Sequence, residues 1–215
     1  MSSALVITLN TTPAQAESLA ALQRLFSEAC NSLAPIMQET RCWNRVALHH
    51  LAYKGLRERY PELGSQMACN AIYSVSRSAR IVYQHPQSPW NIARDPAKKL
   101  PLLQFLPDAP VYFDRHTLSL KAGQLSLFTL DGRMRFQLDL AAADEKQFQC
   151  SKLREIVLIR SGGRFVLQFQ FSDEAELPEP GSDAWTELPE YLVVFPQAPG
   201  SDPVSPSPTN EKTLV

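Results

Sequence analysis

The spacing of apolar residues changes once along this 215-residue chain, and the change divides it into a helical part and a strand part. After a short apolar strand at residues 3–9, apolar residues recur every three or four positions as far as residue 84, which is the period of an amphipathic helix. From Val111 onward they alternate with polar residues, which is the period of a half-buried strand. Helices followed by a run of strands predict an α+β fold.

Three helices are expected in the first part, at residues 13–34, 40–59 and 65–84. The first should begin at Thr12-Pro13, because threonine caps helices and proline suits their first position. Pro35 should end or kink it. One side of the second helix should carry Asn44, Leu48, Leu51 and Gly55, with Ala52 and Leu56 beside it. The apolar stripe of the third comprises Ala68, Ala71, Ile72, Val75, Ala79 and Val82.

The strand part predicts two pairs of hairpin partners. Strands are expected at 111–120, 124–130, 133–140, 153–160 and 164–171, and a last short strand at 191–195. Asp131-Gly132 predicts a tight hairpin, and Ser161-Gly162-Gly163 joins the following pair. We expect these strands to form a small antiparallel β-barrel, with the three helices inserted after its first strand.

This interpretation divides the chain into segments of different composition. The segments are 1–10 with 110–172 as the barrel, 11–85 as the inserted helical lobe, 86–109 as a proline-rich connection, and 173–215 as an acidic, proline-rich tail. Residues 197–215 are expected to be disordered, because they have little apolar surface to bury.

Composition indicates a soluble intracellular protein, and we expect it in the cytoplasm. No run of about 18 apolar residues suggests a membrane span, and the N-terminus lacks the basic start and apolar stretch of a secretory signal. The four cysteines, Cys30, Cys42, Cys69 and Cys150, are far apart and form no CxxC pair, so we expect buried free thiols in a reducing compartment.

Motifs for catalysis or for a cofactor are missing from the sequence. It has no phosphate-binding GxxxxGK[ST], no dinucleotide-binding GxGxxG, no GxSxG and no HExxH. His49 and His50 are adjacent and cannot share one helix face as metal ligands. The acidic groups worth naming are Asp114 with His116, and the cluster of Asp173, Glu174 and Glu176, which we interpret as a solvated edge. We therefore expect no cofactor, no metal and no enzyme activity, and a function based on binding.

Charge is distributed unevenly. Residues 41–99 carry ten Lys/Arg and three Asp/Glu, a net of +7, whereas residues 173–215 carry one Lys and nine Asp/Glu, a net of −8. Two sets of helix positions combine cations with aromatic side chains: Trp43, His50, Lys54 and Arg57, and then Tyr73, Arg77 and Arg80. Cations neutralise phosphates and aromatic rings stack on unpaired bases, so both sets are candidate nucleic-acid-binding residues. The alternative is a solvated helix face, with Trp43 and Tyr73 packed on a neighbouring helix.

Three stretches resemble a known family: TPAQAESLAALQRLFSEACNSLA after the first strand, CWNRVALHHLAYKGLRERYPELGSQMACNAIYSVSRSAR, and VYFDRHTLSLKAGQLSLFTLDGRMRFQL followed by LREIVLIRSGGRFVLQFQF. Over roughly residues 3–172 the chain resembles the N-terminal half of the TnpB (OrfB) transposon-encoded RNA-guided nucleases and of the related type V CRISPR effectors. The resemblance implies a wedge barrel with an inserted recognition lobe, which in that family grips guide RNA and target DNA.

The chain departs from the family after residue 172. The RuvC nuclease domain, with its catalytic aspartate in a GIDxG-like context, and the zinc ribbon are both missing, and a two-metal nuclease needs several converging carboxylates. The resemblance therefore implies recognition of RNA or DNA without cleavage, alone or with a separate RuvC-bearing partner. Two alternatives remain: a domesticated protein-interaction module without nucleic-acid binding, and an enzyme of unrecognised type. An acidic tail could mask the basic faces until a nucleic acid displaces it.

Overall fold

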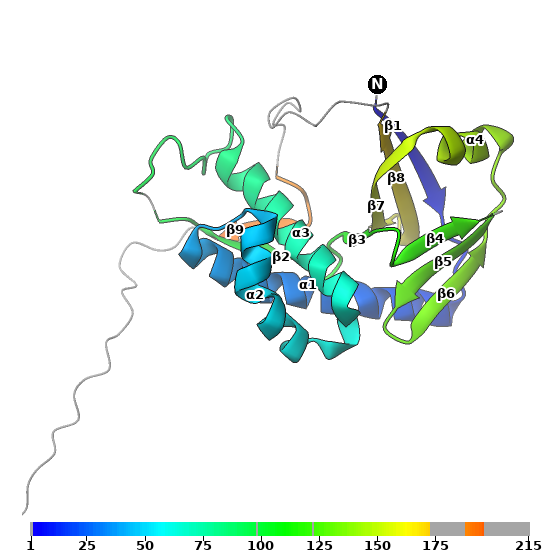
Figure 1. The fold of residues 1–215 in the computed structure, drawn as a ribbon, viewed down its shortest axis with the longest axis horizontal. Helices are drawn as coiled ribbons and strands as arrows, with labels where there is room; N and C mark the ends of the chain where they lie inside the picture. The colour runs from blue at the N-terminus through cyan, green and yellow to red at the C-terminus, as the bar shows by residue number, and fades with distance from the viewer. Residues whose placement is uncertain (1, 98, 122, 173–187, 196–215) are drawn as a thin grey trace, which may run out of the picture.

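The computed structural model describes residues 2–97, 99–121, 123–172 and 188–195 (Figure 1). The helices are α1 (Pro13–Thr40), α2 (Arg45–Arg59), α3 (Gly64–Gln84) and α4 (Ala142–Cys150), with a 3-10 turn at Pro61–Leu63. The strands are β1 (Ser2–Thr8), β2 (Leu102–Phe105), β3 (Val111–Phe113), β4 (Leu118–Lys121), β5 (Gln124–Thr129), β6 (Gly132–Gln137), β7 (Lys152–Ser161), β8 (Arg164–Ser172) and β9 (Leu192–Phe195).

The strands form three antiparallel sheets. The largest has the order β1-β8-β7-β3, a second is the meander β4-β5-β6, and the third pairs β2 with β9. Both predicted hairpins are confirmed, since Thr129 pairs with Gly132 and Ser161 with Arg164. The α+β class is confirmed as well. Among the described residues, however, no sheet closes on itself, because β1 and β6 remain edge strands, and the predicted small barrel is not confirmed.

Helix α1 begins where the sequence predicts and ends later. The Thr12 hydroxyl accepts a hydrogen bond from the Gln15 amide at 3.3 Å, and the Gln15 side chain accepts one from the Thr12 amide at 2.9 Å, a reciprocal cap. The predicted end of this helix at residue 34 is wrong, because α1 continues through Pro35 to Thr40. Pro35 lies on the exposed side, while Ala34 and Met37 are fully buried, so core packing outweighs the one backbone hydrogen bond that proline cannot make.

The segment expected to be an irregular connection lies along α1 and contains β2. Polar side chains on one stripe of α1 hydrogen-bond to the backbone of this connecting segment. The pairs are Gln23 with Asp108, Ser27 with Leu106, Asn31 with Phe105, and Gln38 with Leu100. These bonds satisfy backbone groups that have no sheet partner on that side. Residues 86–109 are therefore in part an ordered strap on the helix, and β2 was missed because it is only four residues long.

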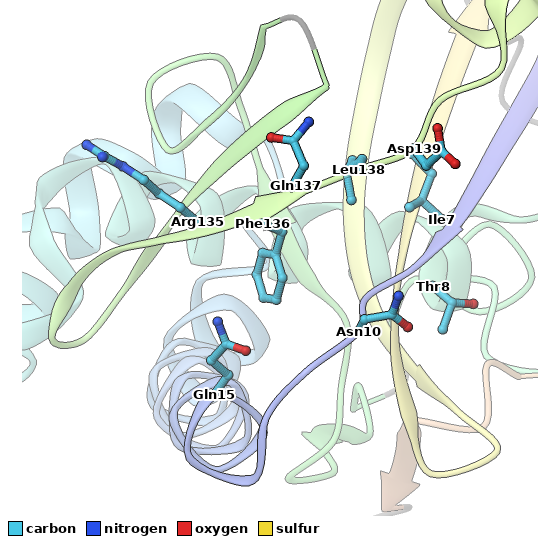
Figure 2. A pocket seen from close by; sticks show the side chains of 9 residues that line it. All are labelled: Ile7, Thr8, Asn10, Gln15, Arg135, Phe136, Gln137, Leu138 and Asp139. Carbon is cyan, nitrogen blue, oxygen red and sulfur yellow. The ribbon is translucent and has the colours of Figure 1, made fainter.

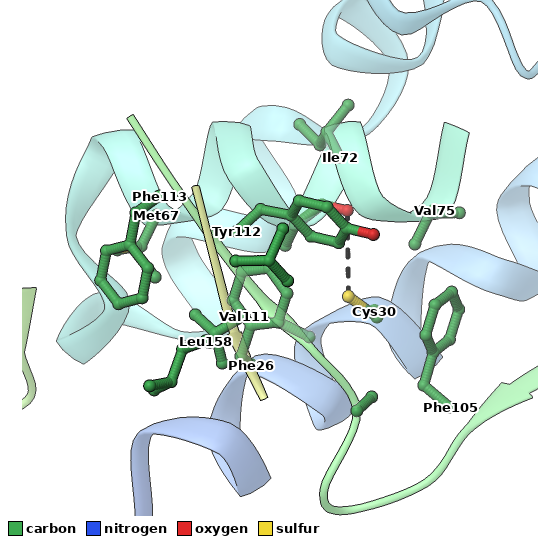
Figure 3. Packing of buried hydrophobic residues seen from close by; sticks show 14 of the residues in the cluster. Phe26, Cys30, Met67, Ile72, Val75, Phe105, Val111, Tyr112, Phe113 and Leu158 are labelled. Carbon is green, nitrogen blue, oxygen red and sulfur yellow. Dashed lines mark hydrogen bonds between the residues drawn. The ribbon is translucent and has the colours of Figure 1, made fainter. Parts of the chain in front are cut away.

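The helical lobe and the large sheet share one hydrophobic core. Figure 3 shows Phe26 and Cys30 of α1 close to Val111 of β3 on one side of α3, and all three residues are buried. The Cys30 thiol donates to the Ala71 carbonyl at 3.9 Å, and burial raises the pKa of this thiol to about 12. The four cysteines are free thiols as expected, although only Cys30 is buried.

The predicted apolar stripe of α3 is confirmed, since all six of its residues are buried. The predicted side of α2 is partly wrong, because Leu48, Ala52 and Leu56 are buried whereas Leu51 is 56% exposed. Helix α4 was not predicted. It brings Phe148 edge-on to Phe169 and so covers part of the large sheet.

Among the described residues, no helix has the length and apolar character needed to cross a membrane. The strand expected at 191–195 is present as β9. The predictions for the rest of the acidic tail, at 173–187 and 196–215, lie outside the described residues.

Candidate nucleic-acid interface

Helices α2 and α3 pack side by side and present a shared surface with basic and aromatic side chains. We call it the α2–α3 face and define it by Arg45, His49, Tyr53 and Arg57 of α2 and Tyr73, Arg77 and Arg80 of α3. The α2 members are spaced by four residues and therefore lie on one side of that helix. That side is turned toward α3, because the Arg45 guanidinium lies 5.5 Å from the ring centre of Tyr73.

Aromatic rings on this face are held in defined positions. The imidazole of His49 stacks on the ring of Tyr53 with centroids 4.5 Å apart and an angle of 19° between the planes. Tyr73 meets Tyr112 of β3 edge to face at 5.4 Å. Stacked and edge-on pairs of this kind contribute about 0.5–1.5 kcal/mol beyond the area that they bury, so these rings have preferred positions on the cationic face.

A carboxylate from the large sheet reaches the edge of the α2–α3 face. The Tyr73 hydroxyl donates to Glu155 Oε1 at 2.7 Å, and Arg77 Nε lies 3.5 Å from the same oxygen. The Glu155 side chain is only 11% exposed, whereas that of Arg77 is 38% exposed. Burial, together with the charge of Glu155 and its hydrogen bond, raises the pKa of Tyr73 to about 12. Tyr73 and Arg77 thus join α3 to β7 as well as contributing to the surface.

The first predicted set of residues is divided by the structure. Trp43 precedes α2 and is partly buried, with its ring 5.8 Å from that of Tyr83 and its carbonyl accepting from Ser76. It therefore packs on a neighbouring helix, as the alternative interpretation had it. His50 and Lys54 are exposed side chains of α2. Arg57 lies on the α2–α3 face, where it also donates to the Pro61 carbonyl at 3.2 Å.

Sequence reasoning missed three members of the face, Arg45, His49 and Tyr53. Their spacing of four residues, continued by Arg57, was visible in the sequence. The sequence did not show that α2 packs on α3. This packing determines that the side of α2 bearing these residues is the one beside α3. The Cys69 thiol of α3 feels the charges of Arg45 and Arg57: its pKa is raised by burial and by Asp114, and these two arginines oppose the rise.

The other polar groups named from the sequence have structural roles or lie elsewhere. Asp114 accepts hydrogen bonds from the amides of His116 and Thr117 at 3.0 and 3.1 Å, so it shapes the turn between β3 and β4. The acidic cluster at residues 173–176 lies outside the described residues. Within the described part of the chain, no three His, Cys, Asp or Glu side chains are grouped as metal ligands.

No protein-family model matches this chain, and a search of curated proteins finds no match. The likeness to the TnpB family therefore rests on the order of elements and on the three stretches of sequence quoted above. The chemistry of the α2–α3 face is independent of that likeness. Four guanidinium groups and three aromatic rings can neutralise phosphates and stack on bases.

Proposed function

We propose that this protein binds nucleic acid without cleaving it, and that it derives from a TnpB or type V effector that has lost its nuclease. Its ligand in this proposal is a guide-like RNA, a DNA target or both, bound alone or together with a separate RuvC-bearing protein in the cytoplasm. The observation that carries the proposal is the α2–α3 face, which bears Arg45, Arg57, Arg77 and Arg80 together with three aromatic rings, and where the Arg45 guanidinium lies 5.5 Å from the ring centre of Tyr73.

The surroundings of this face support the same function. Glu155 is an acidic group that meets it, and this carboxylate is engaged by Tyr73 and Arg77. The register of the large sheet places Gln170 opposite Glu155 and Gln168 opposite Val157. The side chains of Gln170 and Gln168 lie on the same face of the sheet as Glu155. Side chains that pair across strands share a face, and every second residue of a strand lies on the same face. Uncharged amides beside arginines suit a sugar–phosphate backbone, which needs hydrogen-bond donors over a long contact.

The test is a titration of fluorescent single-stranded RNA and duplex DNA by fluorescence anisotropy at several salt concentrations. The test variant combines Arg45→Gln, Arg57→Gln and Arg80→Gln, and leaves Arg77 in place because that residue also joins α3 to the sheet. The matched control removes three exposed cations elsewhere, with Arg24→Gln, Lys146→Gln and Arg164→Gln.

Each lost phosphate contact lowers the slope of log affinity against log salt by roughly 0.7–0.9. The test variant should therefore lose up to about 2–3 units of slope and the control none. If the test variant and the control bind equally well, the α2–α3 face is not the interface. If the intact chain binds neither nucleic acid, the proposal fails, and the interaction-module alternative stands.

A further inference from the structure

Within the described part of the chain, two strand edges that have no sheet partner lie on the same cavity. Strand β1 is one edge of the large sheet, and β6 is one edge of the meander. A cavity of about 350 Å³ lies between them, within the range of roughly 300–1,000 Å³ typical of ligand sites. Its lining comes from the ends of both strands and the start of α1 (Figure 2): Ile7, Thr8, Asn10, Gln15 and residues 135–139.

The backbone of β1 offers hydrogen bonds to this cavity. The Leu9 amide donates to the Phe165 carbonyl at 2.9 Å, and the register pairs Ile7 with Leu167. In an antiparallel ladder the bonded residues alternate, so the odd-numbered residues of β1 bond to β8. The N–H and C=O groups of Val6 and Thr8 consequently point away from β8, toward the free edge.

Strand β6 offers the same pattern from the other side. The Leu138 amide donates to the Gly123 carbonyl at 2.8 Å, and Phe136 pairs with Leu125 in the same register. The even-numbered residues of β6 therefore bond to β5. The N–H and C=O groups of Arg135 and Gln137 point toward the free edge and the cavity.

Side chains around the cavity alternate as they would around a missing strand. Phe136 and Leu138 are 7% and 8% exposed on the inner side, and Ile7 is partly buried there. Thr8 and Gln137 are exposed on the outer side. A strand placed in this gap would find apolar neighbours on one face and polar neighbours on the other.

We propose that this gap binds one extended peptide segment of a partner protein, which pairs with β1 on one edge and with β6 on the other. An extended peptide carries backbone donors and acceptors on both edges at the strand spacing, whereas a nucleic acid does not. The peptide should alternate apolar and polar residues. Arg135 and Asp139, four positions apart along the same edge and both exposed, would favour an acidic residue toward one end of the peptide and a basic residue toward the other.

This inference is independent of the proposed nucleic-acid binding, because the cavity is built from other residues than the α2–α3 face. Joining β1 and β6 through one added strand would also link the large sheet to the meander. Unpaired edges are sites where another chain adds readily, and natural proteins usually protect them. Here the two edges lie on the same cavity, so that one strand would satisfy both.

The test begins with a selection of random nine-residue peptides displayed on phage against the intact chain. The enriched peptide is then titrated against Thr8→Pro and Gln137→Pro, which remove an outward amide, and against Thr8→Ala, which keeps it. Each proline variant should weaken binding about tenfold through the lost backbone hydrogen bond, and Thr8→Ala should bind like the wild type. RNA and DNA affinity should not change in any of them.

A second form of the test does not depend on the folding of the proline variants. The enriched peptide is synthesised with N-methyl groups on alternate residues, which block its hydrogen bonds along one edge while the protein stays intact. Binding should be lost with either methylated set, and amide exchange at Val6, Thr8, Arg135 and Gln137 should slow when the unmodified peptide binds. The proposal is overturned if no peptide is enriched, if methylation has no effect, or if light scattering shows a dimer in which a second copy fills the gap.

Discussion

Arg77 and Arg80 look equivalent in the sequence, but the structure predicts that only Arg77 contributes to folding stability. Arg77 Nε lies 3.5 Å from Glu155 Oε1, and that carboxylate is 11% exposed, with the Tyr73 hydroxyl as its second partner at 2.7 Å. Arg77→Gln leaves a largely buried negative charge without its cationic partner. Breaking a fully buried ion pair costs about 3–5 kcal/mol. Because Arg77 is 38% exposed, solvent screening reduces this, and we expect a loss of about 1–2 kcal/mol.

The measurement is unfolding by urea and by heat, followed by far-ultraviolet circular dichroism. For a chain of this length each kcal/mol corresponds to roughly 2–4 °C in Tm, so Arg77→Gln should lower Tm by about 2–8 °C. Arg80→Gln, at an exposed position, should stay within about 0.5 kcal/mol of the wild type. The double variant Arg77→Gln with Glu155→Gln should recover most of the loss, because a neutral amide does not need the guanidinium. Equal stability of the two arginine variants would refute this account.

Three further predictions concern the same fold. The pKa of Tyr73 is raised from its ordinary value near 10 to about 12, so its contribution to stability is complete below pH 10 and should be lost as the pH rises toward 12. Tyr73→Phe should be less stable than wild type at neutral pH and should lose less stability over that alkaline range, measured by urea unfolding at each pH. Gly55 lies in α2 with nothing near its missing Cβ, so Gly55→Ala should stabilise the protein by about 0.5–1 kcal/mol. Gly123 has φ +73°, and a Cβ there would lie 2.8 Å from the Leu138 carbonyl oxygen. Gly123→Ala should therefore destabilise the protein by about 1–3 kcal/mol. Thermal unfolding should show Tm shifts of opposite sign for the two glycine variants.

Features set by local chemistry could be predicted from the sequence. The cap at Thr12 fixed the start of α1, the apolar period of α3 identified its buried side, and Asp131-Gly132 marked a hairpin. Each depends on residues close together in the chain. The class of the fold follows from these elements, because helices followed by antiparallel strands define it.

Features set by distant contacts could not be predicted. Alternation in β6 shows which side chains are buried, but it does not say whether its free edge meets β1, so an open arrangement and a barrel have the same pattern. The buried side of α2 depends on where α1 and α3 pack, and Leu51 consequently faces solvent. Glu155 lies far along the chain from Tyr73 and Arg77, and nothing in its neighbourhood marks it as their partner.

The pairing of β1 with β8 has a consequence for how the chain folds as it is made. Thr8 pairs with Val166, so during synthesis β1 waits for β8, which lies far along the chain. Helices α1, α2 and α3 contact one another over short separations and can pack early, whereas contacts between distant segments form slowly. Until β8 is synthesised, both edges of β1 are open to other chains. A ribosome that stalls before residue 164 therefore leaves β1 without the strand with which it pairs.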